Sequence, residues 1–150
     1  MTMTIEQVSE KMRDIDYAML VTRTKGGAVA ARPMSNNRDV EYDGDSWFFT
    51  EESALMVSDI TADPHVNLSF QGTSGLLGMR PFFLSVSGRA ALIRDKARFA
   101  EHWTSDLDRW WPQGIDTPGI VLIKVRAERL HYWDGEEEGE VPLISRLAAE

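Results

Sequence analysis

The stretch Ala28-Val-Ala-Ala-Arg-Pro-Met34, followed after a polar connection by Ser46-Trp-Phe-Phe-Thr50, decides the fold. Both segments have the residue types of β-strands. Because proline lacks the N–H that a central strand donates, Pro33 predicts an edge strand, a bulge or backbone left free for a ligand. Thr50 ends the second strand directly before a predicted helix, and helix N-termini suit anionic groups. The stretch therefore outlines an anion-binding site.

Composition restricts the class of protein. A chain of 150 residues with 43% hydrophobic and 27% charged residues fits one soluble globular domain, residues 1–150, with its own core. A formal net charge of -8 argues against general binding to nucleic acid or anionic membrane, which requires a basic face. Without cysteine there is no disulfide, thiolate metal site or cysteine nucleophile. The start has no signal-peptide pattern and no apolar run has membrane-spanning length, so we expect a cytoplasmic protein.

Hydrophobic periodicity predicts six or seven strands with only short helical interruptions. The predicted strands cover residues 17–24, 28–34, 46–50, 66–70, 84–92, 120–126 and 129–133, with a short polar strand near 39–43. The predicted helices cover about residues 4–14, a segment capped by Ser53 and a segment opened by Asp95. Strands so closely spaced imply a mostly antiparallel barrel rather than a parallel sheet.

Three further local features follow from the pattern. Gly88 interrupts a long predicted strand and is a candidate β-bulge. The helix opened by Asp95 has one apolar stripe that ends before Pro112, formed by Ala100, Trp103, Leu107 and Trp110. Residues 135–150 form an acidic tail with a candidate terminal helix.

Sequence motifs for common chemistry are missing. The three histidines, at positions 65, 102 and 131, have no ligand-pair spacing, so metal binding is disfavoured. A G-x-S-x-G elbow is also lacking, which disfavours a serine hydrolase. No residue presents itself as an acid, base or nucleophile, and we name no catalytic residue.

The tryptophans and one arginine are candidates for ligand contact. Trp103, Trp110 and Trp47 are expected in the core, whereas Trp111 and Trp133 each stand beside another aromatic residue that could fill the buried position. For these two we weigh a structural role equally against contact with a planar ligand or an interface.

Arg32, in a half-buried strand, requires an anionic partner, because an unpaired buried charge is costly. A phosphate suits the guanidinium because it can be bound through two hydrogen bonds. A carboxylate is the alternative, and on residue type alone the ion pair is favoured.

Several motifs in order along the chain carry a resemblance. They are Ala31-Arg-Pro-Met34, Asp45-Ser-Trp-Phe-Phe-Thr50, Asp63-Pro-His-Val-Asn-Leu68, Val86-Ser-Gly88, Trp111-Pro-Gln-Gly114 and Tyr132-Trp-Asp134. From about residue 5 to 135 the chain resembles bacterial general stress proteins of the pyridoxamine 5'-phosphate oxidase-like, flavin-binding split-barrel superfamily. The resemblance implies a mainly β fold with short helices, a six-stranded antiparallel split β-barrel, that forms a homodimer with FMN at its interface.

The resemblance also implies which residues contact the cofactor. Arg32 would lie near the phosphate, Phe49 would pack the ring system, and Trp133 would come from the second protomer. Phe83 stands where the oxidases carry a glutamine that touches the flavin. The full set of implied cofactor-binding residues is Arg32, Pro33, Met34, Phe49, Thr50, Ser53, Met56, Phe83, Trp111 and Trp133.

Two departures from the family pattern affect function. Met56 stands where the family usually has a phosphate-binding lysine, and Glu51 and Glu52 precede it. Losing a charge-assisted hydrogen bond costs about 1.5–3 kcal/mol, so we expect weaker FMN binding, or FAD or another flavin held differently. Alternatively, Met56 simply continues an apolar helix stripe. After Trp133 the chain lacks the Arg-x-His-x-Arg segment of true pyridoxamine-phosphate oxidases, so oxidation of that vitamer is not expected.

Three functions remain open from the sequence. The first is an FMN-dependent oxidoreductase, in which the cofactor supplies the chemistry. The second is a flavin-binding or flavin-buffering stress protein without turnover, and the third is a split barrel that has lost FMN and binds another small molecule or none.

Overall fold

Seven antiparallel strands and three short α-helices make up the part of the chain that the computed structural model describes, residues 2–38, 40–74 and 76–143. The strands are β1 (Tyr17–Arg23), β2 (Val29–Ser35), β3 (Asp45–Glu51), β4 (His65–Ser74), β5 (Arg80–Ile93), β6 (Ile120–Asp134) and β7 (Glu137–Val141). The helices are α1 (Ile5–Met12), α2 (Leu55–Ala62) and α3 (Lys96–His102), with 3-10 turns η1 (Leu76–Gly78), η2 (Ser105–Arg109) and η3 (Gly114–Asp116). The predicted fold class, a mainly β antiparallel split barrel with short helices, is confirmed.

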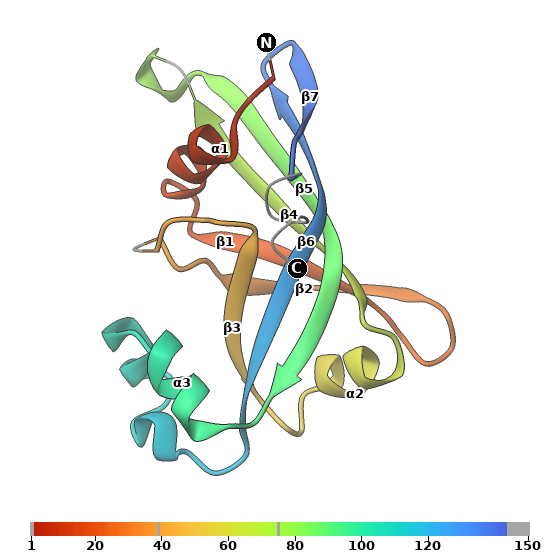
Figure 1. The fold of residues 1–150 in the computed structure, drawn as a ribbon, viewed down its shortest axis with the longest axis vertical. Helices are drawn as coiled ribbons and strands as arrows, with labels where there is room; N and C mark the ends of the chain where they lie inside the picture. Colours follow the sequence, from red (N-terminus) through yellow and green to blue (C-terminus); the bar gives the residue numbers. More distant parts are fainter. Residues whose placement is uncertain (1, 39, 75, 144–150) are drawn as a thin grey trace.

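The strand order explains why the barrel is split. Six strands follow one another as β2-β1-β4-β5-β6-β3, and β7 pairs with β6 outside this path. Within the described part of the chain, β2 pairs only with β1, and β3 only with β6, so these two strands form the ends of the curled sheet. In Figure 1 the sheet curls with α1 toward one end and α3 toward the other, while α2 lies below the β1–β2 hairpin. Pro33 therefore lies on an end strand, where its missing N–H is tolerated.

A bulge bends the longest strand pair. The pairing of β5 with β6 shifts between Ser87 and Gly88. A Cβ at Gly88 would lie 2.1 Å from the carbonyl oxygen of Arg126, so a side chain does not fit there. The predicted bulge is confirmed. The predicted strands 120–126 and 129–133 are the two halves of one strand, β6, which pairs with β3 before the bend and with β7 after it.

The inward-facing residues form the main core of the barrel. On β1 the buried residues Ala18, Leu20 and Thr22 alternate with residues that face outward. Tyr132 is buried, and its hydroxyl accepts a hydrogen bond from the Met3 backbone N–H at 3.1 Å. This contact fixes the chain before α1 against the far half of β6, so α1 closes one end of the barrel.

The helix starts differ from one another. α1 has the predicted capping box, in which Thr4 and Gln7 each accept from the other's backbone N–H. The predicted Ser53 cap of α2 is wrong. The N-cap is Ala54, without a side-chain hydrogen bond, because Ser53 lies exposed in the turn one residue earlier.

The long apolar stripe predicted after Asp95 is also wrong. α3 ends at His102, and Trp103 has an extended backbone, so the helical period stops there. Ala100 is exposed and Trp110 is 61% exposed, whereas the neighbouring Trp111 packs inward. The expectation that Trp110 belongs to the core therefore fails together with the helix that carried it.

Two further segments differ from the prediction. Residues 40–44 form no strand, although their neighbours Ser35 and Asp45 belong to β2 and β3. The predicted acidic tail contains β7, whose carboxylates face outward while its backbone pairs with β6. The candidate terminal helix falls mostly on residues 144–150, outside the described residues. No described helix has the length and apolar character needed to cross a membrane.

Candidate functional site

The outward face of the sheet, opposite the core, carries large apolar side chains. Phe83 on β5 and Trp133 on β6 are direct cross-strand partners, 40% and 38% exposed. Tyr17 and Met19 extend this surface along β1. A neighbouring row of residues crosses the sheet from β2 to β6, and each residue in it is the cross-strand partner of the next: Pro33, Met19, Ser69, Ser85 and His131. We call this surface the outer face.

A histidine fixes the exposed tryptophan of the outer face. The ring of His131 stacks on Trp133 with centroids 4.4 Å apart and planes inclined by 27°. Its Nε2 lies 2.6 Å from a carboxylate oxygen of Glu138, and its Nδ1 lies 3.8 Å from Glu140. Both glutamates belong to β7. The hairpin that sequence analysis treated as an acidic tail therefore positions a predicted site residue.

Arg32 lies on the opposite side of β2, where the strand faces α2. Its Nη1 donates to the Thr22 hydroxyl at 2.7 Å and to the Leu20 carbonyl at 3.3 Å. Its Nη2 lies 3.5 Å from Oδ2 of Asp59, which also accepts from Thr22 at 2.9 Å. Asp59 is 8% exposed. The carboxylate partner that was favoured on residue type alone is thus present, and we call this group the Arg32 network.

The other predicted cofactor-binding residues of β2, β3 and the α2 region lie around this network or in the core. Met34 and Thr50 are buried on the inward side of β2 and β3. Met56 is half-buried on α2 and packs against the main core, as the apolar-stripe alternative predicts. Ser53 is exposed in the turn before α2. The residues of α2 itself, Leu55–Ala62, thus include no lysine or arginine.

Two predicted ring contacts belong instead to a second core. Phe49 packs edge-on against Trp103 at 4.9 Å and Trp111 at 6.4 Å between centroids. These rings join Phe99 of α3 in a cluster on the far side of β3 and β6 from the barrel interior. The predicted site residues therefore lie in three places: the outer face, the Arg32 network with the adjoining part of the main core, and this second core.

Charged pairs surround the start of α2. The Arg94 guanidinium binds both carboxylate oxygens of Glu52, the Nη2–Oε2 distance being 3.1 Å, and lowers the pKa of Glu52. Glu51, one residue earlier, is exposed. At the other end of the helix, hydrogen bonds from His65 lower the pKa of Asp63. In the described part of the chain, no group of three or more His, Asp or Glu side chains could hold a metal ion.

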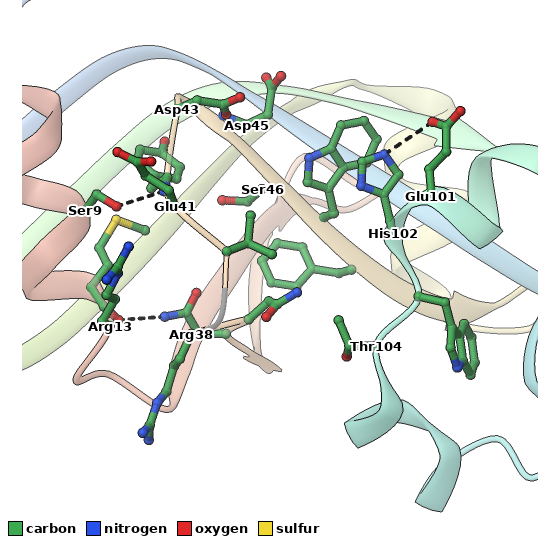
Figure 2. A pocket seen from close by; sticks show the side chains of 18 residues that line it. Ser9, Arg13, Arg38, Glu41, Asp43, Asp45, Ser46, Glu101, His102 and Thr104 are labelled. Atoms are coloured by element: carbon green, nitrogen blue, oxygen red, sulfur yellow. Dashed lines mark hydrogen bonds and ion pairs between the residues drawn. The ribbon is translucent and has the colours of Figure 1, made fainter.

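A cavity of 480 Å³ lies apart from all ten predicted residues. Figure 2 shows its lining, from Ser9 of α1 and Arg38 of the connection on one side to His102 and Thr104 on the other. His102 stacks on Trp47 at 3.5 Å, and burial, followed by the charge of Arg98, lowers the pKa of His102. Sequence reasoning gave no signal for this cavity because its walls come from segments distant along the chain.

The site residues can be tested against a flavin. A flat ring system needs aromatic or apolar surface, and Phe83 and Trp133 offer it on an exposed face. A phosphate needs cations or free N–H donors, and the guanidinium of Arg32 is already bound to Asp59. The residues therefore fit the ring of the cofactor but not its phosphate.

The fold is that of a split-barrel protein of a known class. A family profile described as pyridoxamine 5'-phosphate oxidase like matches residues 3–150, and the chain belongs to this family. Protein bli-3 of Neurospora crassa is 26% identical over 138 residues, which cover 85% of this chain. The match spans 63% of the length of that relative.

Solved structures share the fold at low identity. A protein related to general stress protein 26 from Clostridium acetobutylicum has a TM-score of 0.76 at 20% identity, covering 94% of this chain and 95% of that chain. The general stress FMN/FAD binding protein from Xanthomonas citri has a TM-score of 0.69 at 22% identity, covering 88% and 89%. A heme binding protein from Mycobacterium smegmatis has a TM-score of 0.75 at 15% identity, covering 99% and 61%. The resemblance to the general stress proteins is confirmed.

Proposed function

We propose that this protein is a homodimeric flavin-binding oxidoreductase of the FMN class. The observation that carries the proposal is the exposed Phe83–Trp133 pair on the outer face. Monomeric soluble proteins rarely leave contiguous large apolar side chains in water, and such surfaces mark binding sites or interfaces. The family membership and the FMN/FAD binding general stress protein of the same fold support a flavin as the ligand.

Two copies paired through their outer faces would cover this surface. Tyr17, Met19, Phe83 and Trp133 would then be buried, and the partner's Trp133 could meet a ring system held along β2. Aromatic residues and methionine are enriched in protein interfaces, which supports this arrangement. The small Ser69 and Ser85 between them allow close approach of the two sheets.

The chain's own role would be to bind and orient the cofactor. A bound flavin supplies hydride or electron transfer at its ring. Trp133, fixed by His131, would cover the ring and exclude water from one side. His131 is the titratable residue that stacks on Trp133. Its ring also lies within hydrogen-bond distance of the Glu138 carboxylate.

The first experiment measures binding and assembly. Titration of the apo-protein with FMN should give saturable quenching of tryptophan fluorescence at micromolar concentrations, and analytical ultracentrifugation should show a dimer. Phe83→Glu, which places a charge on the outer face, should give a folded monomer with weaker binding. Absence of saturable quenching in the parent protein would contradict the proposal.

A second experiment separates an enzyme from a binding protein without turnover. NADH or NADPH is added to the FMN complex under anaerobic conditions, and flavin absorbance is followed. Bleaching well above the rate for free FMN supports an oxidoreductase. An unaccelerated rate favours the alternative of flavin storage without turnover.

A heme ligand is a further alternative because a heme binding protein shares the fold. Hemin titration followed in the Soret region tests it directly. We expect hemin neither to saturate at stoichiometric amounts nor to displace FMN. Stoichiometric hemin binding without flavin binding would assign the outer face to heme instead.

A further inference from the structure

We infer that this protein recognises a flavin by its ring and sugar and gains little from the phosphate, so that it binds riboflavin about as well as FMN. The inference rests on the proposed function, because it concerns which flavin the proposed binding protein prefers. It follows from the Arg32 network and from the charges around the start of α2.

The first argument is that Arg32 already has an anionic partner. Its Nη2 lies 3.5 Å from Asp59, and its Nη1 donates to the Thr22 hydroxyl at 2.7 Å and to a main-chain carbonyl. Thr22 in turn donates to the same oxygen of Asp59 at 2.9 Å. A phosphate that approached Arg32 would have to displace the Asp59 carboxylate, which is held by both Arg32 and Thr22.

The second argument is the cost of that displacement. Asp59 and Thr22 are both buried, and the Arg32 side chain is 21% exposed. Separating a buried carboxylate from its partner leaves an uncompensated charge, which is strongly unfavourable. A phosphate placed next to the intact pair would instead face the negative charge of Asp59. Both arrangements remove the gain that a phosphate normally obtains from a guanidinium.

The third argument is the charge balance around the start of α2. Two guanidinium groups, on Arg32 and Arg94, stand in this region, and both are paired. The same region contains three carboxylates, on Asp59, Glu51 and Glu52. The helix itself, Leu55–Ala62, contains no lysine or arginine. Its first turn therefore offers backbone dipoles to a phosphate but no charge of its own.

A ribityl chain suits the same groups better than a phosphate does. Its hydroxyls can donate to a carboxylate and accept from a hydroxyl or a guanidinium. Asp59, Thr22 and Arg32 provide these three types of group within one network. The neutral part of the flavin thus finds complementary partners, whereas the dianionic part finds a carboxylate.

The experiment compares two ligands that differ only in the phosphate. Dissociation constants of riboflavin and FMN are measured with the full-length apo-protein by tryptophan quenching. We expect values within about threefold, since a phosphate held by a free cation would favour FMN by roughly 10- to 150-fold. A preference of more than tenfold for FMN overturns the inference but leaves the proposed function standing. If neither ligand binds at micromolar concentration, the proposed function is overturned as well.

A variant tests the cause. Asp59→Asn keeps the size and an acceptor oxygen for Thr22 but frees the charge of Arg32, so FMN should bind about tenfold tighter while riboflavin is unchanged. Asp63→Asn is the matched control, because this carboxylate at the end of α2 contacts Arg23 and His65 instead. Equal gains for both ligands, or none for FMN, would show that Arg32 does not face the phosphate.

Salt dependence tests the same point in the unaltered protein. Raising the salt concentration from about 0.05 to 0.5 M screens contacts between a phosphate and exposed cations. We expect the ratio of the two dissociation constants to stay constant. A selective weakening of FMN would reveal a phosphate–cation contact and overturn the inference even if Asp59→Asn failed to fold.

Discussion

The two aromatic groups of this protein are held in opposite ways. In the second core, Phe49 and Phe99 meet edge-on at 5.8 Å under α3, and Phe99 is 4% exposed. On the outer face, Phe83 and Trp133 pair across two strands and each remains more than a third exposed. Phe49 lies on β3 and Phe83 on β5, the two strands that flank β6, and Trp133 lies on β6 itself. Burial by a helix therefore separates aromatic residues that stabilise the fold from those available to a ligand or a partner.

The largest expected effect contrasts the same substitution in both groups. Phe99→Ala should lower the free energy of unfolding by about 3–5 kcal/mol, because it leaves a cavity among packed rings. Phe83→Ala should lower it by only about 1 kcal/mol in the isolated protomer, because the ring is partly in water already. Urea denaturation followed by far-UV circular dichroism measures both values.

Protein concentration adds a control to this contrast. If Phe83 lies in a dimer interface, the effect of Phe83→Ala on the unfolding midpoint depends on protein concentration, whereas that of Phe99→Ala does not. Equal, concentration-independent losses for the two variants would contradict the distinction between a structural and an exposed aromatic group.

The fold was largely predictable because its signals are local. Alternation of apolar and polar residues located most strands, and Gly88 marked the bulge, since only a residue without a side chain fits beside Arg126. The errors came from places where the period of the pattern breaks. α3 ends at His102, so the apolar stripe that was predicted to continue through Trp110 has no helix beyond that residue. β7 was missed because its outward carboxylates resemble a solvated tail.

The site was harder to predict, since its geometry depends on contacts between distant segments. The sequence indicated that Arg32 needs an anionic partner. It did not indicate that Asp59, 27 positions later on α2, would be that partner. The sequence also did not distinguish the roles of Trp111 and Trp133, which differ only in the folded structure. Trp111 packs into the second core, while Trp133 stays exposed with His131 stacked on it.

A second prediction asks whether the exposed aromatic pair or a cation dominates flavin binding. Met56→Lys adds a charge at the start of α2, and the long side chain can reach past the core surface that Met56 now covers. We expect FMN to bind about tenfold tighter or more, from about 1.5–3 kcal/mol for a charge-assisted hydrogen bond. Riboflavin, titrated in parallel, should be unaffected. Unchanged FMN affinity would show that this helix start does not face the phosphate.

A smaller effect is expected when the exposed ring itself is removed. Trp133→Ala should weaken flavin binding about 2- to 13-fold, from about 0.5–1.5 kcal/mol for a ring–ring contact. Trp110→Ala is the matched control, because Trp110 is also exposed but lies over Arg109 near the second core. Isothermal titration with FMN measures both variants. Equal losses in the two would mean that the outer face has no special role in binding.

The smallest effect concerns a titratable ring at the edge of the second core. Burial and the nearby Arg98 lower the pKa of His102, which stacks on Trp47. The folded state therefore favours the neutral imidazole, so its contribution to stability is present above the unfolded pKa of about 6.5 and is lost as the pH falls below it. Urea unfolding of the wild type and of His102→Gln across this range should show a steeper acid loss in the wild type. Parallel curves would mean that the His102 ring is solvated. The second core would then end at Trp47 and would not include the stacked histidine.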